Sequence, residues 1–253
     1  MLSSVPGVTT VDLQPHTVEA FDRYIDSAEI RLERQAHSQD FLWANGSTDR
    51  KIRVRRGEVI AQPWTGKGDV DVPDGSIHDW IGAIFIPGTT LEKTLAMARD
   101  YDSHHFIYKP EVQKSKVIKH TGNDFQVYLQ LLKKEVITVV LNTNHDVRYF
   151  PLDPAHCYSQ SHTTRIAEVE NPGDSDEREM QPGHDHGFLW RLNSYWRFEE
   201  RDGGVYVECE AISLTRGVPA GLGWLINPIV RNLPRESLAN SLKTMRNALT
   251  APR

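Results

Sequence analysis

The sequence predicts an α+β protein in which an antiparallel sheet of about six or seven twisted strands wraps around one long C-terminal helix, with a helical extension at the N-terminus. Two observations lead to this fold class. Residues 77–214 contain a succession of segments in which apolar and polar residues alternate, separated by turn-forming residues. The last two segments run directly into an apolar, proline-interrupted tail over residues 219–249, which supplies a helix to cover the apolar face of the sheet.

The N-terminal 75 residues are expected to form an extension that packs on a main domain of residues 76–253. Residues 17–37 are predicted to be helical, because Phe21, Ile25, Ala28 and Leu32 recur at helical spacing. Residues 51–63 alternate and are predicted to form one or two strands, and a loop rich in Gly and Asp follows over residues 65–75. This part of the chain contains too little apolar material to bury a core of its own.

The main domain is predicted to start with a strand over residues 77–87 and a short helix capped by Thr89 or Thr90. Strands are then expected over residues 112–120, 124–133, 137–150, 156–169, 187–200 and 203–214. The acidic stretch 170–186 between them is predicted to be an exposed loop. Pro234 marks the first turn of the final helix, whose core-facing residues are expected to be Leu238, Leu242, Met245 and Leu249.

The last predicted hairpin has a register that its residues define. A loop at residues 201–204 places Arg197 opposite Glu208 and Tyr195 opposite Glu210, which pairs opposite charges and gathers the apolar residues on the other face. We expect this charged face to lie outward in water, where such ion pairs are common and weak. The alternative is that the same set lies inside a pocket and orients the oxygen atoms of a ligand.

Composition excludes several classes of function. Charged residues make up 25% of the 253 residues and hydrophobic residues 39%, as in ordinary globular proteins. With 34 acidic and 29 basic residues the net charge is −5, so the chain lacks a broad positive field that would attract nucleic acid. No nucleotide-binding glycine motif and no nucleophile motif occurs, and we expect no nucleic-acid partner and no cofactor.

The cysteines and the N-terminus bear on the compartment. Cys157 and Cys209 do not have metal-type spacing, and Cys209 lies in an alternating strand, where a buried structural thiol is expected. Residues 1–6 lack the basic start and apolar core of a signal peptide, so we expect a cytoplasmic protein, or a secreted one if a leader was removed. The apolar run 220–230 is too short to span a bilayer.

Two stretches resemble a known superfamily. The pattern formed by Leu95, Tyr101-Asp102, residues 106–112 and residues 115–117 resembles the early segment of START-like proteins, the polyketide cyclase/dehydrase and lipid-transport superfamily. The final hairpin, Gly217-Val218-Pro219 and the helix from Pro234 are similar to the ending of that family. The resemblance covers roughly residues 76–250. It implies a helix-grip fold around a hydrophobic cavity, and it carries over no catalytic residue.

Three functions follow from these patterns. The first is a non-catalytic protein that binds or carries a hydrophobic small molecule, such as a lipid, an isoprenoid or a polyketide-like compound. The second is a cyclase or dehydratase that uses Arg197, Tyr195, Glu208 or Glu210. The third is a regulatory protein with a filled core, which contacts a partner through residues 17–37. For the first function, the residues expected to line the cavity are Trp80, Ile84, Tyr108, Trp190, Leu192, Trp196, Val207, Cys209, Ala211, Leu238, Leu242 and Met245.

The histidines offer two weaker candidates. His184 and His186 form an HxH pair that places both imidazoles on one face of a strand, but the spacing supplies no third ligand, so we expect no metal site. His104 and His105 lie beside Tyr101 at a helix break. A role in proton transfer at the mouth of a pocket is one interpretation, and an exposed turn is the one we favour.

Overall fold

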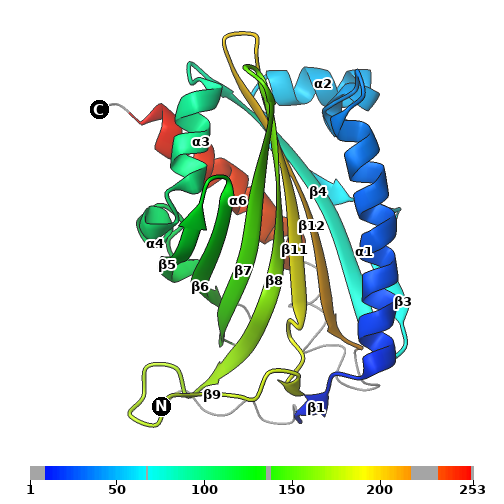
Figure 1. Cartoon of the computed structure of the whole chain (residues 1–253), viewed down its shortest axis with the longest axis vertical. Helices are drawn as coiled ribbons and strands as arrows, with labels where there is room; N and C mark the ends of the chain where they lie inside the picture. The colour runs from blue at the N-terminus through cyan, green and yellow to red at the C-terminus, as the bar shows by residue number, and fades with distance from the viewer. Residues whose placement is uncertain (1–8, 67, 135–137, 218–232, 252–253) are drawn as a thin grey trace.

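A single antiparallel sheet forms the centre of the computed structural model, which describes residues 9–66, 68–134, 138–217 and 233–251 (Figure 1). The main path of the sheet runs β2-β4-β12-β11-β8-β7-β6-β5, with β3 paired to β4 and β9 paired to β8. The described strands of this sheet are β2 (Ile60–Pro63), β3 (Asp69–Val72), β4 (Gly75–Pro87), β5 (Val112–Thr121), β6 (Asp124–Lys134), β7 (Thr138–Asp153), β8 (His156–Glu170), β9 (Arg178–Glu179), β11 (Arg191–Arg201) and β12 (Gly204–Arg216).

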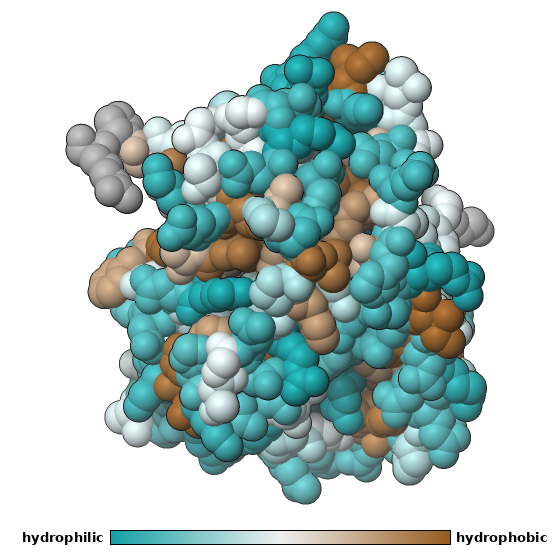
Figure 2. All heavy atoms as spheres, turned by 45° about the horizontal axis from the view of Figure 1, so that its top comes forward, coloured by the Kyte–Doolittle hydropathy of each residue, from teal (hydrophilic) through white to brown (hydrophobic). Residues whose placement is uncertain are grey.

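Helices cover both faces of the sheet and make a three-layered molecule (Figure 1). Helix α1 (Pro15–Ala36), the short helix η1 (Trp43–Gly46) and α2 (Thr48–Arg55) cover what we call the outer face. Helices α3 (Leu91–Arg99) and α6 (Leu233–Thr250) cover the inner face, and η2 (Tyr101–Ser103) and α4 (His104–Ile107) follow α3 beside β5. In the view of Figure 2, hydrophobic side chains appear in separate areas between hydrophilic ones.

The α+β class and the C-terminal helix over the sheet are confirmed, and the hairpin register is confirmed residue by residue. Tyr195 pairs with Glu210 and Arg197 with Glu208. The turn between β11 and β12 consists of Asp202 and Gly203, with φ angles of 58° and 76°. Two consecutive residues with positive φ match the twist of the flanking strands, which explains why an Asp-Gly pair stands at this hairpin.

The N-terminal region differs from the prediction in two places. The alternation of residues 51–56 predicted a strand, but residues 48–55 form helix α2, because Ser47 caps it by accepting the backbone N–H of Arg50. The helix buries only Val54, so its apolar pattern is too sparse to be recognised as a helix. The predicted loop 65–75 contains β3, which pairs with β4 and brings the extension into the main sheet.

The structure also contains more strands than expected, and two of them form a small sheet of their own. The stretch 170–186 was predicted to be an exposed loop, yet it holds β9 on the edge of β8 and β10 (His184–Asp185), which pairs with β1 (Val11–Asp12). Asp185 is buried there and accepts the indole N–H of Trp190 at 2.9 Å. The predicted strand from residue 187 begins only at Arg191. The apolar tail segment 219–232 lies outside the described residues.

Candidate ligand-binding cavity

A cavity of about 320 Å³ lies between the inner face of the sheet and helix α6. Its floor is formed by β6, β7, β8, β11 and β12, one wall by α6, and another by Tyr101, His104 and Tyr108 around α4. Apolar side chains make up most of this lining. They include Val127, Leu129, Leu141, Val147, Tyr149, Leu192, Trp196, Phe198, Leu238 and Met245.

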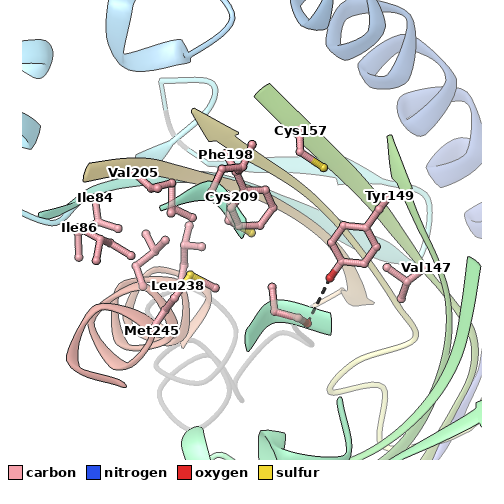
Figure 3. Close-up of a cluster of buried hydrophobic side chains, with 14 of the residues drawn as sticks. Ile84, Ile86, Val147, Tyr149, Cys157, Phe198, Val205, Cys209, Leu238 and Met245 are labelled. Atoms are coloured by element: carbon pink, nitrogen blue, oxygen red, sulfur yellow. Dashed lines mark hydrogen bonds between the residues drawn. The ribbon is translucent and has the colours of Figure 1, made fainter. Parts of the chain in front are cut away.

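The cavity exists because α6 covers only part of the inner face. The helix packs chiefly on β4, and a Cβ atom at Gly82 would lie 2.8 Å from Leu242 Cδ1 and 3.0 Å from Leu238 Cγ. The absent side chain at Gly82 therefore lets the helix approach the β4 side closely. Figure 3 shows Leu238 and Met245 of α6 near Ile84, Ile86 and Val205, with Tyr149 and Val147 on the strands at the opposite side.

Small residues on the floor leave further space. Across the inner face, Ser194 lies opposite Ala211, and Trp196 lies opposite Cys209. Ala211 and Cys209 both line the cavity. The space above these small side chains is therefore open and is not filled by interdigitating neighbours.

The predicted lining residues divide into three groups. Seven of them border the cavity, namely Tyr108, Leu192, Trp196, Cys209, Ala211, Leu238 and Met245. Four lie in the inner core near α6, away from the cavity lining, namely Trp80, Ile84, Val207 and Leu242. The twelfth, Trp190, was wrongly assigned to the inner face. It packs with Phe21, Ile212 and Leu214 on the outer face, because the strand alternation does not extend beyond Arg191.

The charged ladder of the last hairpin is not exposed to water, contrary to our expectation. Tyr195, Arg197, Glu208 and Glu210 are each no more than 3% exposed. They lie on the outer face beneath the N-terminal extension, so they do not reach the cavity either. The cyclase or dehydratase hypothesis placed this set inside the pocket, and the structure places it on the opposite side of the sheet.

Each carboxylate of the ladder has a partner from the extension. Glu208 accepts the backbone N–H groups of Trp43 and Ala44 at 2.7 and 2.8 Å, where η1 begins. Glu210 receives both ends of the Arg31 guanidinium of α1. Burial raises the pKa of Glu208 to about 7. These contacts attach the extension to the sheet and give the ladder a structural role.

The aromatic wall of the cavity contains a hydrogen-bonded pair of phenols. The hydroxyls of Tyr101 and Tyr149 are 2.9 Å apart, and Tyr149 donates to the backbone carbonyl of Ala98 at 3.2 Å. His104 beside them is buried and not in the exposed turn we expected, since α4 turns its side chain toward the cavity. Burial lowers the pKa of His104 to about 4, so the imidazole is neutral at physiological pH.

Sequence reasoning missed His145 on β7, which also lines the cavity together with Ser159 and Ser161 of β8. The available signal was the alternation of β7, where Leu141, His145 and Val147 share the inner face. A polar residue at an inward position of an otherwise apolar series is informative once the direction of the strand is known.

The two histidines of the HxH pair have different partners. His184 contacts Asp12, while His186 Nδ1 lies 2.8 Å from Glu168 Oε2, so the two imidazoles have different carboxylate partners. No cluster of three His, Cys, Asp or Glu side chains suited to a metal ion occurs in residues 9–66, 68–134, 138–217 and 233–251. Among the same residues, no helix is long and apolar enough to cross a membrane.

Comparison with solved structures identifies the architecture. The STAR-related lipid transfer protein of Xanthomonas axonopodis superimposes with a TM-score of 0.51 at 14% identity, covering 73% of this chain and 99% of that one. This chain has the START-like helix-grip fold. The predicted resemblance to the START-like superfamily is thereby confirmed at the level of the fold.

Two further solved structures superimpose less closely. The human StarD13 lipid transfer and protein localization domain has a TM-score of 0.48 at 6% identity and covers 83% of this chain and 98% of its own. The Zhui aromatase/cyclase from Streptomyces sp. R1128 has a TM-score of 0.40 at 12% identity and covers 68% and 93%. No family model and no curated protein matches the sequence.

Proposed function

We propose that this protein binds and carries a hydrophobic small molecule in the cavity between its sheet and α6. The observation that carries the proposal is the cavity itself, with a volume of about 320 Å³ and a lining that is largely aliphatic and aromatic. Ligand sites range from about 300 to 1,000 Å³. The volume is at the lower end of this range and favours one compact molecule over a lipid with two long chains.

The alternatives have less support. The hypothesis of a regulatory protein with a filled core predicts a closely packed interior, whereas about 320 Å³ between the sheet and α6 is open. A cyclase or dehydratase that uses Arg197 or Glu210 would need those residues in the cavity, and they lie on the outer face.

Filling the cavity tests the proposal. Ala211 borders the open volume, so Ala211→Trp places an indole in it. We expect the affinity for the neutral fluorescent probe N-phenyl-1-naphthylamine to fall about tenfold, which corresponds to about 1.4 kcal/mol. Ala248→Trp, on an exposed position of α6, is the matched control and should bind as the wild type does.

Native mass spectrometry of protein purified without detergent provides an independent measurement. A co-purified apolar compound that is lost in Ala211→Trp supports the proposal. Failure of the wild type to bind the probe, together with the absence of any co-purified compound in repeated preparations, would refute it.

A further inference from the structure

The hydrogen bonds of His145 in the cavity floor show which of its ring nitrogens carries the hydrogen. His145 is 7% exposed, and its Nε2 lies 2.8 Å from Thr143 Oγ1. Thr143 donates its own hydroxyl proton to the carbonyl of Leu129 at 3.0 Å. Because that proton is engaged, Thr143 accepts from His145, and Nε2 carries the imidazole hydrogen.

The other ring nitrogen is therefore an acceptor with a poor partner. His145 Nδ1 lies 3.4 Å from Ser161 Oγ, beyond the range of about 2.5–3.2 Å of good hydrogen bonds. Burial lowers the pKa of His145 to about 4, so Nδ1 carries no proton at neutral pH. Nδ1 is therefore a buried acceptor with only a weak hydrogen bond, and a ligand donor that reaches it at a shorter distance would form a stronger one.

Hydroxyl groups on the neighbouring strands lie beside this acceptor. Ser161 of β8 pairs in register with Ser194 of β11, and both line the cavity with His145. We call His145, Ser161 and Ser194 the polar floor. None of the three carries a charge, so the polar floor favours a neutral group over a carboxylate, whose buried charge would lack a cation.

The lining residue Lys133, which could supply a cation to a carboxylate, is far from the polar floor. His145 pairs with Val127 of β6, whereas Lys133 lies six residues further along the same strand, a distance of about 20 Å. The ammonium of Lys133 donates to Ser237 of α6 at 2.6 Å, so the protein engages it directly.

We propose that the polar floor is a subsite for one hydroxyl group of a compact, uncharged ligand, a phenol or a cyclic alcohol. The ligand hydroxyl donates to His145 Nδ1, and the Ser161 hydroxyl, released from its long contact, donates to the ligand oxygen. The apolar part of the ligand occupies the space beside Trp196, Leu238 and Met245. This inference rests on the proposed function and narrows it to a ligand class.

Three matched probes test the subsite, namely naphthalene, 2-naphthol and 2-naphthoate, with dissociation constants measured by fluorescence titration. The wild type should bind 2-naphthol about tenfold more tightly than naphthalene, in keeping with one hydrogen bond of about 1.4 kcal/mol. The carboxylate of 2-naphthoate should provide no such gain.

Variants locate the preference. In His145→Leu and in Ser161→Ala, the dissociation constants for naphthalene and 2-naphthol should differ by no more than about threefold. The dissociation constant for naphthalene itself should stay within about twofold of the wild-type value. Unchanged naphthalene binding shows that the cavity is intact. Ser241→Ala removes a hydroxyl that lines the cavity from α6 and should keep the full preference.

The outcomes separate the two proposals. Equal binding of naphthalene and 2-naphthol by the wild type, a preference for 2-naphthoate, or a preference that survives in His145→Leu would overturn the subsite and leave the proposed function standing. If the wild type binds neither aromatic probe nor N-phenyl-1-naphthylamine, both proposals fail.

Discussion

Asp79 on β4 is a carboxyl group that the fold keeps away from water. It is fully buried on the outer face, and the hydroxyl of Tyr24 on α1 donates to its Oδ2 at 2.7 Å. Burial, followed by the nearby charge of Glu210, raises the pKa of Asp79 to about 8. The folded protein therefore holds a proton at Asp79 over a pH range in which the unfolded chain has released it.

This raised pKa makes stability depend on pH. Below about pH 4, Asp79 is protonated in both the folded and the unfolded chain, and its carboxyl group does not reduce stability. As pH rises from about 4 to 8, the unfolded chain releases this proton while the folded chain keeps it, so the free energy of unfolding falls. Asp79→Asn, which mimics the protonated acid, should gain stability relative to the wild type as pH rises, so that the difference between their free energies of unfolding is roughly 2–4 kcal/mol larger at pH 9 than at pH 5. Urea unfolding at both values measures this difference. Asp22→Asn, at an exposed position of α1, is the control variant. If Asp79→Asn and the wild type differ by the same free energy of unfolding at pH 5 and at pH 9, the raised pKa of Asp79 is contradicted.

At the scale of elements, the contact between α6 and β4 determines where the cavity lies. Leu238 and Leu242 lie directly over Gly82, so the helix covers this side of the inner face and leaves the floor from β6 to β11 open. A helix displaced from Gly82 would lose this close packing.

Gly82→Val tests that contact. The new side chain would overlap Leu238 and Leu242, and overpacking of this kind costs about 1–3 kcal/mol. We expect this loss in the free energy of unfolding measured with urea. Gly66→Val is the control, because apart from its chain neighbours a Cβ at Gly66 would meet no atom within 4 Å. An equal loss in both variants would mean that α6 does not depend on the absent side chain.

At the scale of the whole molecule, the N-terminal extension and the sheet are joined through buried charge. Arg31 of α1 contacts Glu210, whose side chain has no exposed surface, and its guanidinium also stacks 3.8 Å from the centre of the Trp64 ring. Residues nearly 180 positions apart in the chain thus form one ion pair between two layers of the protein.

Removing the cation leaves a buried carboxylate without its partner. Arg31→Met should reduce the free energy of unfolding by about 3–5 kcal/mol. In the double variant, the additional change Glu210→Gln removes the unpaired charge and should restore a large part of this loss. Arg53→Met removes an exposed pair with Glu58 and should cost far less, because water and salt screen exposed ion pairs. If Arg31→Met costs as little as Arg53→Met, the pair does not hold the layers together.

Local patterns determined much of this protein. The alternation of residues 191–214 and the charge pairs of Arg197 and Tyr195 were sufficient to derive the last hairpin and its register, because both depend on neighbouring strands with a short turn between them. The helical spacing of Phe21, Ile25, Ala28 and Leu32 likewise defined α1. Together with the order of the strands, these patterns led to the α+β class and a sheet closed by its C-terminal helix.

Only the tertiary structure decided which surface each face meets. Alternation separates two faces of a strand, but it contains no information about the layer that will cover them, since that layer comes from distant parts of the chain. Arg197 and Glu210 therefore lie buried under α1 instead of in water, and Ile84 and Leu242 pack together instead of lining the cavity. His145 became a candidate site residue only when the fold placed an inward-facing imidazole beside Ser161 in a cavity that α6 leaves uncovered.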